Sequence, residues 1–124
     1  MTKNAVGVDI IEIERIERAL ARFGPRFLGR VYTPLEAAFC RGRVSELAAR
    51  FAAKEAVMKA LGRGWGAKVR WLDIEVARAR SGKPDIVLHD KTAKLAEEMG
   101  IRRWALSITH TKQHGLAFVI AQDE

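Results

Sequence analysis

The stretch Phe51–Gly62, which reads FAAKEAVMKALG, decides the fold of this chain. Alanines and larger apolar residues recur through it at helical spacing, and no proline interrupts the run. The same pattern extends upstream to Glu46, while Gly62 supplies a stop signal. We therefore expect a long helix over Glu46–Leu61, around which the rest of the chain packs.

The charged side chains of this helix do not form a solvated face. Lys54 falls inside the apolar stripe, whereas Glu55 and Lys59 are four residues apart and lie side by side at its edge. Such a Glu–Lys pair is also a common helix stabiliser, and the Lys54 amine could extend past the core into water. Alanines cover the far side, and Ala48 and Ala52 continue the edge that carries Glu55. We expect this edge to border a cleft, with room for a bulky group above the carboxylate.

Shorter elements are expected before the long helix. Apolar and β-branched residues predict a buried strand over Ala5–Ile11. A helical repeat then runs from Ile13 to Phe23, and Gly24–Pro25 stops it. Thr33–Glu36 combines a threonine N-cap, a proline and a glutamate three residues after the cap, which is a capping box and predicts a further short helix.

After the long helix the apolar period changes from helical spacing to alternation, which indicates strands. The expected elements are a strand through Leu72–Val76, a turn at Ser81–Pro84, a strand over Asp85–His89, a helix over Asp90–Met99, and strands over Trp104–Thr109 and Leu116–Ala121. The fold class is thus α+β, with two hairpins forming an antiparallel sheet packed against the long helix, and additional short helices. We expect one domain over residues 1–124, because a chain of 124 residues supports a single modest core.

Composition limits the function classes. The net charge of +7 implies an anionic partner, which nucleic acid, phosphorylated small molecules and acidic proteins would all satisfy. Charges interrupt every apolar run, so we expect no signal peptide, membrane span or membrane partner. The single Cys40 excludes an internal disulfide, no Cys/His spacing suggests zinc, and a soluble cytoplasmic protein is expected.

A second acidic residue belongs with the helix edge. Asp9 follows the apolar run Val6–Val8, where a carboxylate is most often a helix cap or a first-turn acid. Together with Glu55 it would supply two hard oxygen ligands for Mg²⁺, which commonly binds one or two carboxylates, waters and phosphate oxygens. Lysines beside such a site would neutralise the remaining phosphate charge.

Three sequence blocks, in this order and separation, resemble the short, stand-alone members of the 4'-phosphopantetheinyl transferase superfamily, the holo-acyl-carrier-protein synthases. The resemblance covers essentially the whole chain, and the blocks are Gly7–Ile10 with Glu12 and Arg15, Arg50–Ala56 with Lys59, Ala60 and Gly62, and Ser107–Thr111. It implies transfer of the 4'-phosphopantetheine group of coenzyme A to a serine of apo acyl carrier protein, with release of adenosine 3',5'-bisphosphate.

The resemblance also implies roles for particular residues. Asp9 and Glu55 would hold Mg²⁺ and, with Lys59, form the catalytic set, in which Glu55 helps to deprotonate the serine and Lys59 neutralises phosphoryl charge. Lys54 would contact phosphate or support the local structure, and Arg50 would bind a phosphate or belong to the basic surface. The expected coenzyme A contacts are Arg50, Lys54, Lys59, Gly62, Gly82, Lys83, Pro84, Ser107, Thr109 and His110.

Two partners are implied in the same way. Arg15, Arg26 and Phe27 match positions that dock the acidic carrier protein, where attraction between opposite charges would speed encounter. The family commonly forms a homotrimer with each site between neighbouring subunits, so a chain this small would gain core by assembling. One departure is Gly62–Arg63–Gly64, where the family commonly has Gly-Thr-Gly, and Arg63 would place an extra charge near the phosphates.

Two other functions remain open at this point. A small basic α+β chain could bind RNA, although no strand carries the paired aromatics that stack bases in common sheet-type modules. The same carboxylates could also serve a Mg²⁺-dependent phosphohydrolase, although no convincing set of further acidic ligands is present. We therefore expect a transferase and no nucleic-acid partner.

Overall fold

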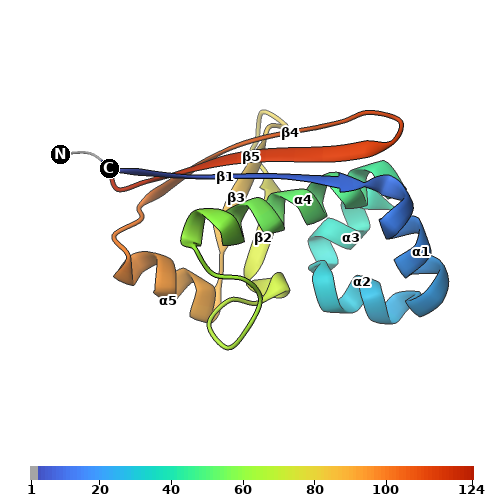
Figure 1. Cartoon of the computed structure of the whole chain (residues 1–124), viewed down its shortest axis with the longest axis horizontal. Helices are drawn as coiled ribbons and strands as arrows, with labels where there is room; N and C mark the ends of the chain where they lie inside the picture. The colour runs from blue at the N-terminus through green and yellow to red at the C-terminus, as the bar shows by residue number, and fades with distance from the viewer. Residues whose placement is uncertain (1–2) are drawn as a thin grey trace.

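This computed structural model describes residues 3–124. They contain five helices, five strands and one short 3-10 turn, joined by loops (Figure 1). In chain order they are β1 (Asn4–Glu12), α1 (Ile13–Phe23), α2 (Pro25–Val31), α3 (Pro34–Cys40), α4 (Val44–Leu61), the 3-10 turn (Trp71–Asp73), β2 (Ile74–Arg78), β3 (Pro84–Leu88), α5 (Asp90–Glu98), β4 (Arg103–His110) and β5 (His114–Gln122). The α+β class expected from the sequence is confirmed.

The strands form two sheets. The first and last strands, β1 and β5, pair with each other in a three-stranded antiparallel sheet of order β1–β5–β4, and β2 and β3 form a separate antiparallel pair. The expectation that both hairpins join one sheet is therefore wrong, although β3 packs beside β4. Helix α4 runs along one face of the larger sheet, with α1, α2 and α3 gathered near one end and α5 near the other (Figure 1).

The small alanine side chains of α4 allow the helix backbone to pack very close to the sheet. A Cβ atom added at Gly7 of β1 would fall 1.8 Å from the Ala56 carbonyl oxygen, and one at Gly115 of β5 would fall 2.9 Å from the Ala48 backbone. Only small residues allow such an approach. Ala48 and Ala52 are fully buried, so the room that the sequence suggested above Glu55 on their side is filled by the sheet.

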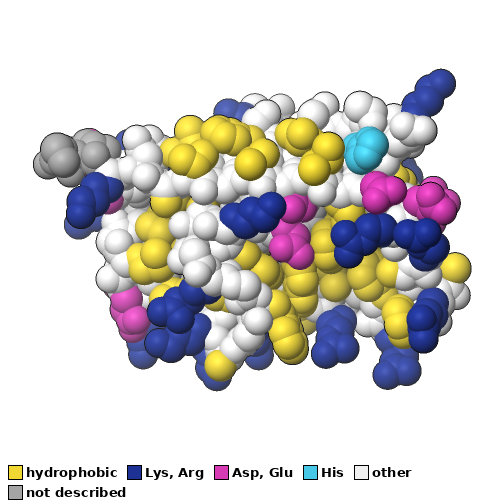
Figure 2. Space-filling view, in the orientation of Figure 1, with side chains coloured by type: hydrophobic (Ala, Val, Ile, Leu, Met, Phe, Trp, Pro, Cys, Tyr) yellow, Lys and Arg dark blue, Asp and Glu magenta, His cyan; other side chains and the backbone are white. Residues whose placement is uncertain are grey.

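Only one face of β1 is buried, contrary to the expectation of a wholly buried strand. Asp9 and its neighbours of the same parity face α4, whereas Val6, Val8 and Ile10 are each more than half exposed. In the strand register these three pair with Ile120, Phe118 and Leu116 of β5, so the outer face of the sheet is apolar. Figure 2 shows hydrophobic side chains gathered along the edge of the molecule where these strands lie.

The short helices follow local capping signals, with one addition. Thr33 and Glu36 form the expected capping box, in which the Thr33 side chain accepts from the Glu36 backbone N–H and Glu36 accepts from the Thr33 N–H. Helix α2 was not foreseen, because Gly24–Pro25 reads as a stop although proline also suits the first turn of a helix. Among the described residues no helix is long and apolar enough to span a membrane.

Candidate active site

The structure brings together the three side chains that the sequence placed in a catalytic set. Asp9 comes from β1, while Glu55 and Lys59 lie one turn apart on α4. The Lys59 ammonium donates to Asp9 Oδ1 at 3.0 Å and to the Val8 carbonyl oxygen at 2.9 Å. The Lys59 side chain remains 55% exposed, so it can reach a ligand from this position.

The electrostatics of the cluster centre on Glu55. Burial, and then the neighbouring negative charge of Asp9, raise the pKa of the Glu55 carboxyl above its ordinary value, while Lys59 and Arg15 act in the opposite direction. The two carboxylates therefore lie close enough to repel each other, and Arg15 of α1 contributes to the same field. Figure 2 shows acidic side chains near the centre of this face with basic side chains on both sides.

This donor set fits a magnesium ion. Two neighbouring carboxylates are the hard oxygen donors that Mg²⁺ prefers, and a divalent cation would relieve the repulsion that Asp9 exerts on Glu55. Within residues 3–124 no group of three or more His, Cys, Asp or Glu side chains is arranged to hold a metal. Asp9 and Glu55 would thus leave the remaining positions to water and to phosphate oxygens, as is usual for Mg²⁺.

Lys54 has a different place from the one expected for a coenzyme A ligand. Its side chain is completely buried, and its ammonium donates to Glu36 Oε1 at 2.7 Å, to the Val31 carbonyl at 2.6 Å and to the Trp71 carbonyl at 3.0 Å. Burial lowers the pKa of Lys54, although the Glu36 carboxylate counteracts this. Of the two roles expected for Lys54, these contacts fit support of the local structure, and complete burial is contrary to the expected contact with coenzyme A. Lys54 joins α4 to α2, α3 and the 3-10 turn.

The buried pair extends into a larger polar network. Glu36 Oε2 accepts from the Val76 backbone N–H at 2.8 Å, and the Thr33 hydroxyl donates to Glu75 Oε2 at 2.6 Å. Glu75 Oε1 lies 3.0 Å from His89 Nε2. Burial alone would raise the pKa of Glu75, but the Thr33 and His89 contacts bring it below its usual range. The network joins α3 and α4 to the β2–β3 pair, and within it His89 has a structural role.

Arg50 is buried beside an acidic and an aromatic neighbour. Its Nη1 atom is 2.7 Å from Glu46 Oε2, and its guanidinium lies over the Phe39 ring at 4.4 Å from the centroid. The Nε atom is buried and has no hydrogen-bond partner among the described residues. The buried Nε–H is therefore an unused donor, and the contact of Arg50 with coenzyme A stays a prediction.

The β4 candidates lie on the opposite edge of the sheet from Asp9. Ser107 and Thr109 are exposed on its outer face, while His110 Nε2 is 4.0 Å from Glu46 Oε1. A hollow of about 300 Å³ opens there, lined by Glu46, Ala49, Ile108, Thr109 and His110. Because β5 lies between β4 and β1, and Asp9 faces inward, a single copy of the chain does not gather Asp9, Ser107 and Thr109 around one cleft.

The glycine candidates have clear conformational roles. Gly62 caps α4 in the left-handed region with φ of 72°, and Gly82 has φ of 89° in the turn between β2 and β3. Lys83 is exposed at that turn, and Pro84 begins β3. Among the described residues, no hydrogen bond or ion pair joins the β2–β3 turn to Asp9 or Glu55. The roles of Gly62, Gly82, Lys83 and Pro84 toward coenzyme A stay predictions.

The expected docking residues divide between two places. Arg26 and Phe27 of α2 line a hollow of about 210 Å³ together with Phe23 and Arg30. Arg15 lies on α1, where its charge acts on Glu55. The sequence did not single out Phe23 or Arg30, although both are large side chains within four residues of Arg26 and Phe27.

Comparison with known proteins decides the family. The model of the 4'-phosphopantetheinyl transferase superfamily matches residues 5–118. This chain belongs to that superfamily. It is 49% identical to the holo-[acyl-carrier-protein] synthase of Solibacter usitatus over 94% of this chain and 96% of that protein. It is 46% identical to the enzyme of the same name from Moorella thermoacetica over 94% of this chain and 91% of that protein.

Solved structures of superfamily members agree with this assignment. The Helicobacter pylori holo-[acyl-carrier-protein] synthase, solved in complex with coenzyme A, matches with a TM-score of 0.86 at 34% identity, covering 94% of this chain and 98% of that one. The Neisseria meningitidis enzyme matches with a TM-score of 0.86 at 39% identity, covering 94% and 96% of the two chains. The resemblance identified from the sequence blocks, and the enzyme class of phosphopantetheinyl transferase, are confirmed.

Proposed function

We propose that this phosphopantetheinyl transferase moves the 4'-phosphopantetheine group of coenzyme A onto a serine of an acidic apo acyl carrier protein in a Mg²⁺-dependent reaction. The observation that carries the proposal is the cluster of Asp9, Glu55 and Lys59, two carboxylates and one exposed ammonium at the meeting of β1 and α4. The solved relative from Helicobacter pylori in complex with coenzyme A supports coenzyme A as the donor.

The reaction would be a displacement at phosphorus. The serine hydroxyl attacks the β-phosphate of coenzyme A, the bond from that phosphorus to the bridging oxygen breaks, and adenosine 3',5'-bisphosphate leaves with the electron pair. Bound Mg²⁺ would supply charge neutralisation on the pyrophosphate oxygens. Glu55, with its raised pKa, is suited to accept the hydroxyl proton, and Lys59 is placed to stabilise charge on the transferred group. Catalysis is then mainly positioning and electrostatics.

The proposal is tested by product analysis in the presence and absence of the metal. The protein is incubated with coenzyme A and apo carrier protein, and adenosine 3',5'-bisphosphate is measured by chromatography with Mg²⁺ or with EDTA. We expect release of this nucleotide only with Mg²⁺. Equal release in EDTA would contradict the magnesium site, and another nucleotide product would contradict the proposed bond cleavage.

The raised pKa of Glu55 predicts the pH dependence of magnesium binding. Mg²⁺ binds the deprotonated carboxylate, and a carboxyl whose pKa is raised keeps its proton to a higher pH, so binding is lost as the pH falls through that raised value. As the pH falls, we expect magnesium binding to be lost already at a pH above the one at which an ordinary glutamate becomes protonated. Lys59→Met should move the transition to still higher pH, because Lys59 opposes the shift. Calorimetric titration with Mg²⁺ over a pH series measures the pH at which binding is lost in the wild-type protein and in Lys59→Met. The same pH in both proteins would contradict an effect of Lys59 on the pKa of Glu55.

We propose that the outer face of the β1–β5–β4 sheet joins copies of this chain, in a homotrimer whose sites lie between subunits. In three consecutive rows of this face, seven of nine positions are apolar: Val6–Ile120–Ala105, Val8–Phe118–Ser107 and Ile10–Leu116–Thr109. A contiguous apolar surface of this kind marks an interaction site. A second copy would also supply what one subunit lacks, because Asp9 and the β4 candidates lie at opposite edges of the sheet.

The assembly has a direct test at the centre of this face. Phe118 is 41% exposed, so Phe118→Glu should leave the monomer folded while separating the subunits and lowering transferase activity. Sedimentation velocity measures the mass, and Leu35→Glu is the matched control because Leu35 is an exposed leucine on α3. If the Phe118→Glu protein stayed trimeric and active, this face would not be part of the interface.

Arg15 and the α2 hollow are the proposed carrier-protein contacts. Arg26 and Arg30 line this hollow together with Phe23 and Phe27, a mixture of positive charge and apolar surface that suits an acidic partner with exposed apolar residues. We expect Arg15→Glu to weaken use of the carrier protein by about tenfold or more in kcat/KM, while coenzyme A binding changes little. Arg18→Glu is the control, because Arg18 is an exposed arginine on the same helix. Equal loss of coenzyme A binding in Arg15→Glu would argue for a structural role.

We further propose that residues 1–124 act as one domain in the cytoplasm. Helix α4 packs against both sheets and α1, which supports a single unit. The only cysteine, Cys40, is a buried free thiol whose pKa is raised by burial to about 11, as suits a reducing compartment. Nothing in the comparisons favours the RNA-binding alternative.

A further inference from the structure

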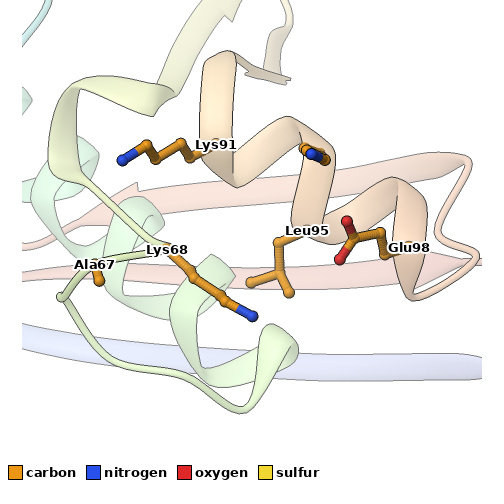
Figure 3. A pocket seen from close by; sticks show the side chains of 6 residues that line it. Ala67, Lys68, Lys91, Leu95 and Glu98 are labelled. Carbon is orange, nitrogen blue, oxygen red and sulfur yellow. The ribbon is translucent and has the colours of Figure 1, made fainter.

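A lysine-lined hollow lies apart from the cluster of Asp9, Glu55 and Lys59. It has a volume of about 370 Å³ between α5 and the loop that follows α4. Figure 3 shows Ala67 and Lys68 on the loop side and Lys91, Leu95 and Glu98 on the helix. The full lining is Ala67, Lys68, Lys91, Lys94, Leu95 and Glu98. The volume is in the range of small-molecule sites, which is on the order of 300–1,000 Å³.

The charge around this hollow is unbalanced. Lys68, Lys91 and Lys94 face one acid, Glu98, and none of these lysine ammonium groups is ion-paired with a carboxylate among residues 3–124. The other acid near the loop, Asp73, is already engaged by Arg70 and by the Thr92 hydroxyl. Three ammonium groups and one carboxylate give the lining of this hollow a net positive charge, which favours a bound anion.

The loop that carries Lys68 is hydrogen-bonded to α5, although the loop itself forms no helix or strand. The Thr92 hydroxyl accepts from the Arg70 backbone N–H at 3.2 Å, and its single proton is shared between the Lys68 carbonyl oxygen at 3.3 Å and Asp73 Oδ2 at 3.2 Å, which ties the loop to α5. Residues 62–70 form no helix or strand, and Gly66 N–H donates to the Val69 carbonyl across the turn that presents Lys68. Lys68 therefore faces α5 from a fixed backbone position on the other wall of the hollow.

We propose that this hollow binds a small molecule bearing two or more phosphate groups. Lysine ammonium groups are compact, flexible point charges that suit phosphate oxygens, and three of them match a polyphosphate better than a single carboxylate. Leu95 and Ala67 supply an apolar wall for an organic group. In Figure 3 Glu98 lies beyond Leu95 from Lys91, so the phosphates bind toward Lys91 and a neutral or hydroxyl-bearing part faces Glu98. This site is separate from the proposed transferase site and does not depend on it.

Inorganic pyrophosphate is the probe, and EDTA is present to keep Mg²⁺ from the Asp9–Glu55 cluster. Isothermal titration calorimetry at constant ionic strength compares the wild-type protein with Lys68→Gln/Lys91→Gln/Lys94→Gln. The control is Lys3→Gln/Arg22→Gln/Arg102→Gln, which removes the same charge from exposed positions outside the hollow. We expect the hollow variant to bind about tenfold or more weakly and the control to stay within about twofold. Orthophosphate should bind the wild type more weakly than pyrophosphate, because it meets fewer ammonium groups.

Backbone amide chemical shifts locate the probe independently of affinity. Pyrophosphate should shift the amides of Ala67, Lys68 and Lys91 in the wild-type protein, and a folded hollow variant should lose these shifts. The proposal is overturned if both triple variants weaken binding equally, since that reports net charge alone. It is also overturned if the shifts occur only around Lys59, or if the wild-type protein binds no pyrophosphate.

Discussion

Glu55→Gln is expected to lower the rate of phosphopantetheine transfer roughly 10²–10³-fold while leaving the protein folded. The substitution keeps the size of the side chain but removes the negative charge, so one of the two proposed magnesium ligands and the proposed proton acceptor are lost together. Asp9→Asn should have a similar effect through the metal alone. Stopped assays of carrier protein modification at saturating coenzyme A measure these rates.

The stability of these variants serves as their control. Because burial and Asp9 raise the pKa of Glu55, removing its charge relieves repulsion and should not destabilise the fold. Thermal unfolding should therefore give a Glu55→Gln melting temperature equal to or above that of the wild type. A folded Glu55→Gln protein with full Mg²⁺-dependent activity would show that this carboxylate is not a ligand.

Lys54→Met is expected to destabilise the protein by about 3–5 kcal/mol, the largest stability effect predicted for a single side chain here. The ammonium of Lys54 is wholly buried, and its loss would leave Glu36 without its positive partner and the Val31 carbonyl without its donor. Methionine has nearly the same volume, so the effect would come from the unpaired charge and carbonyl groups rather than from a cavity. Urea unfolding followed by circular dichroism measures it.

Lys59→Met on the same helix is the matched comparison. Its side chain is 55% exposed, so the free energy of unfolding should change little, whereas turnover should fall because the phosphoryl charge loses its partner. Lys54→Met should thus lower the stability of the fold, whereas Lys59→Met should lower the rate of transfer. A stable Lys54→Met protein that has lost coenzyme A affinity would reverse the role that the structure gives Lys54.

The sequence predicted the long helix because its apolar period is strong and glycine ends it. It also identified the edge with Glu55 and Lys59, since residues four apart on a helix are neighbours regardless of tertiary packing. The joining of Asp9 to that edge required the sequence blocks shared with the superfamily, because Asp9 on β1 and Lys59 on α4 are 50 positions apart in the sequence. Local patterns cannot specify such a contact.

Lys54 and the alanines show where sequence reasoning stopped. A lysine in an apolar stripe reads equally as a ligand or as a buried ion, and only its proximity to Glu36, eighteen residues away, decides between them. Alanines suggested open space, but the backbone of α4 lies against Gly7 and Gly115. The sequence predicted burial for both faces of β1, because an apolar run does not distinguish a core from an exposed apolar surface.

The central claim is tested most directly by the intact mass of an apo acyl carrier protein after incubation with this protein, coenzyme A and Mg²⁺. The account predicts a mass increase of one phosphopantetheine group, located on a single serine and absent when Glu55→Gln replaces the wild type at the same concentration. No mass gain on any apo carrier protein tried, with folded enzyme and Mg²⁺ present, would contradict it.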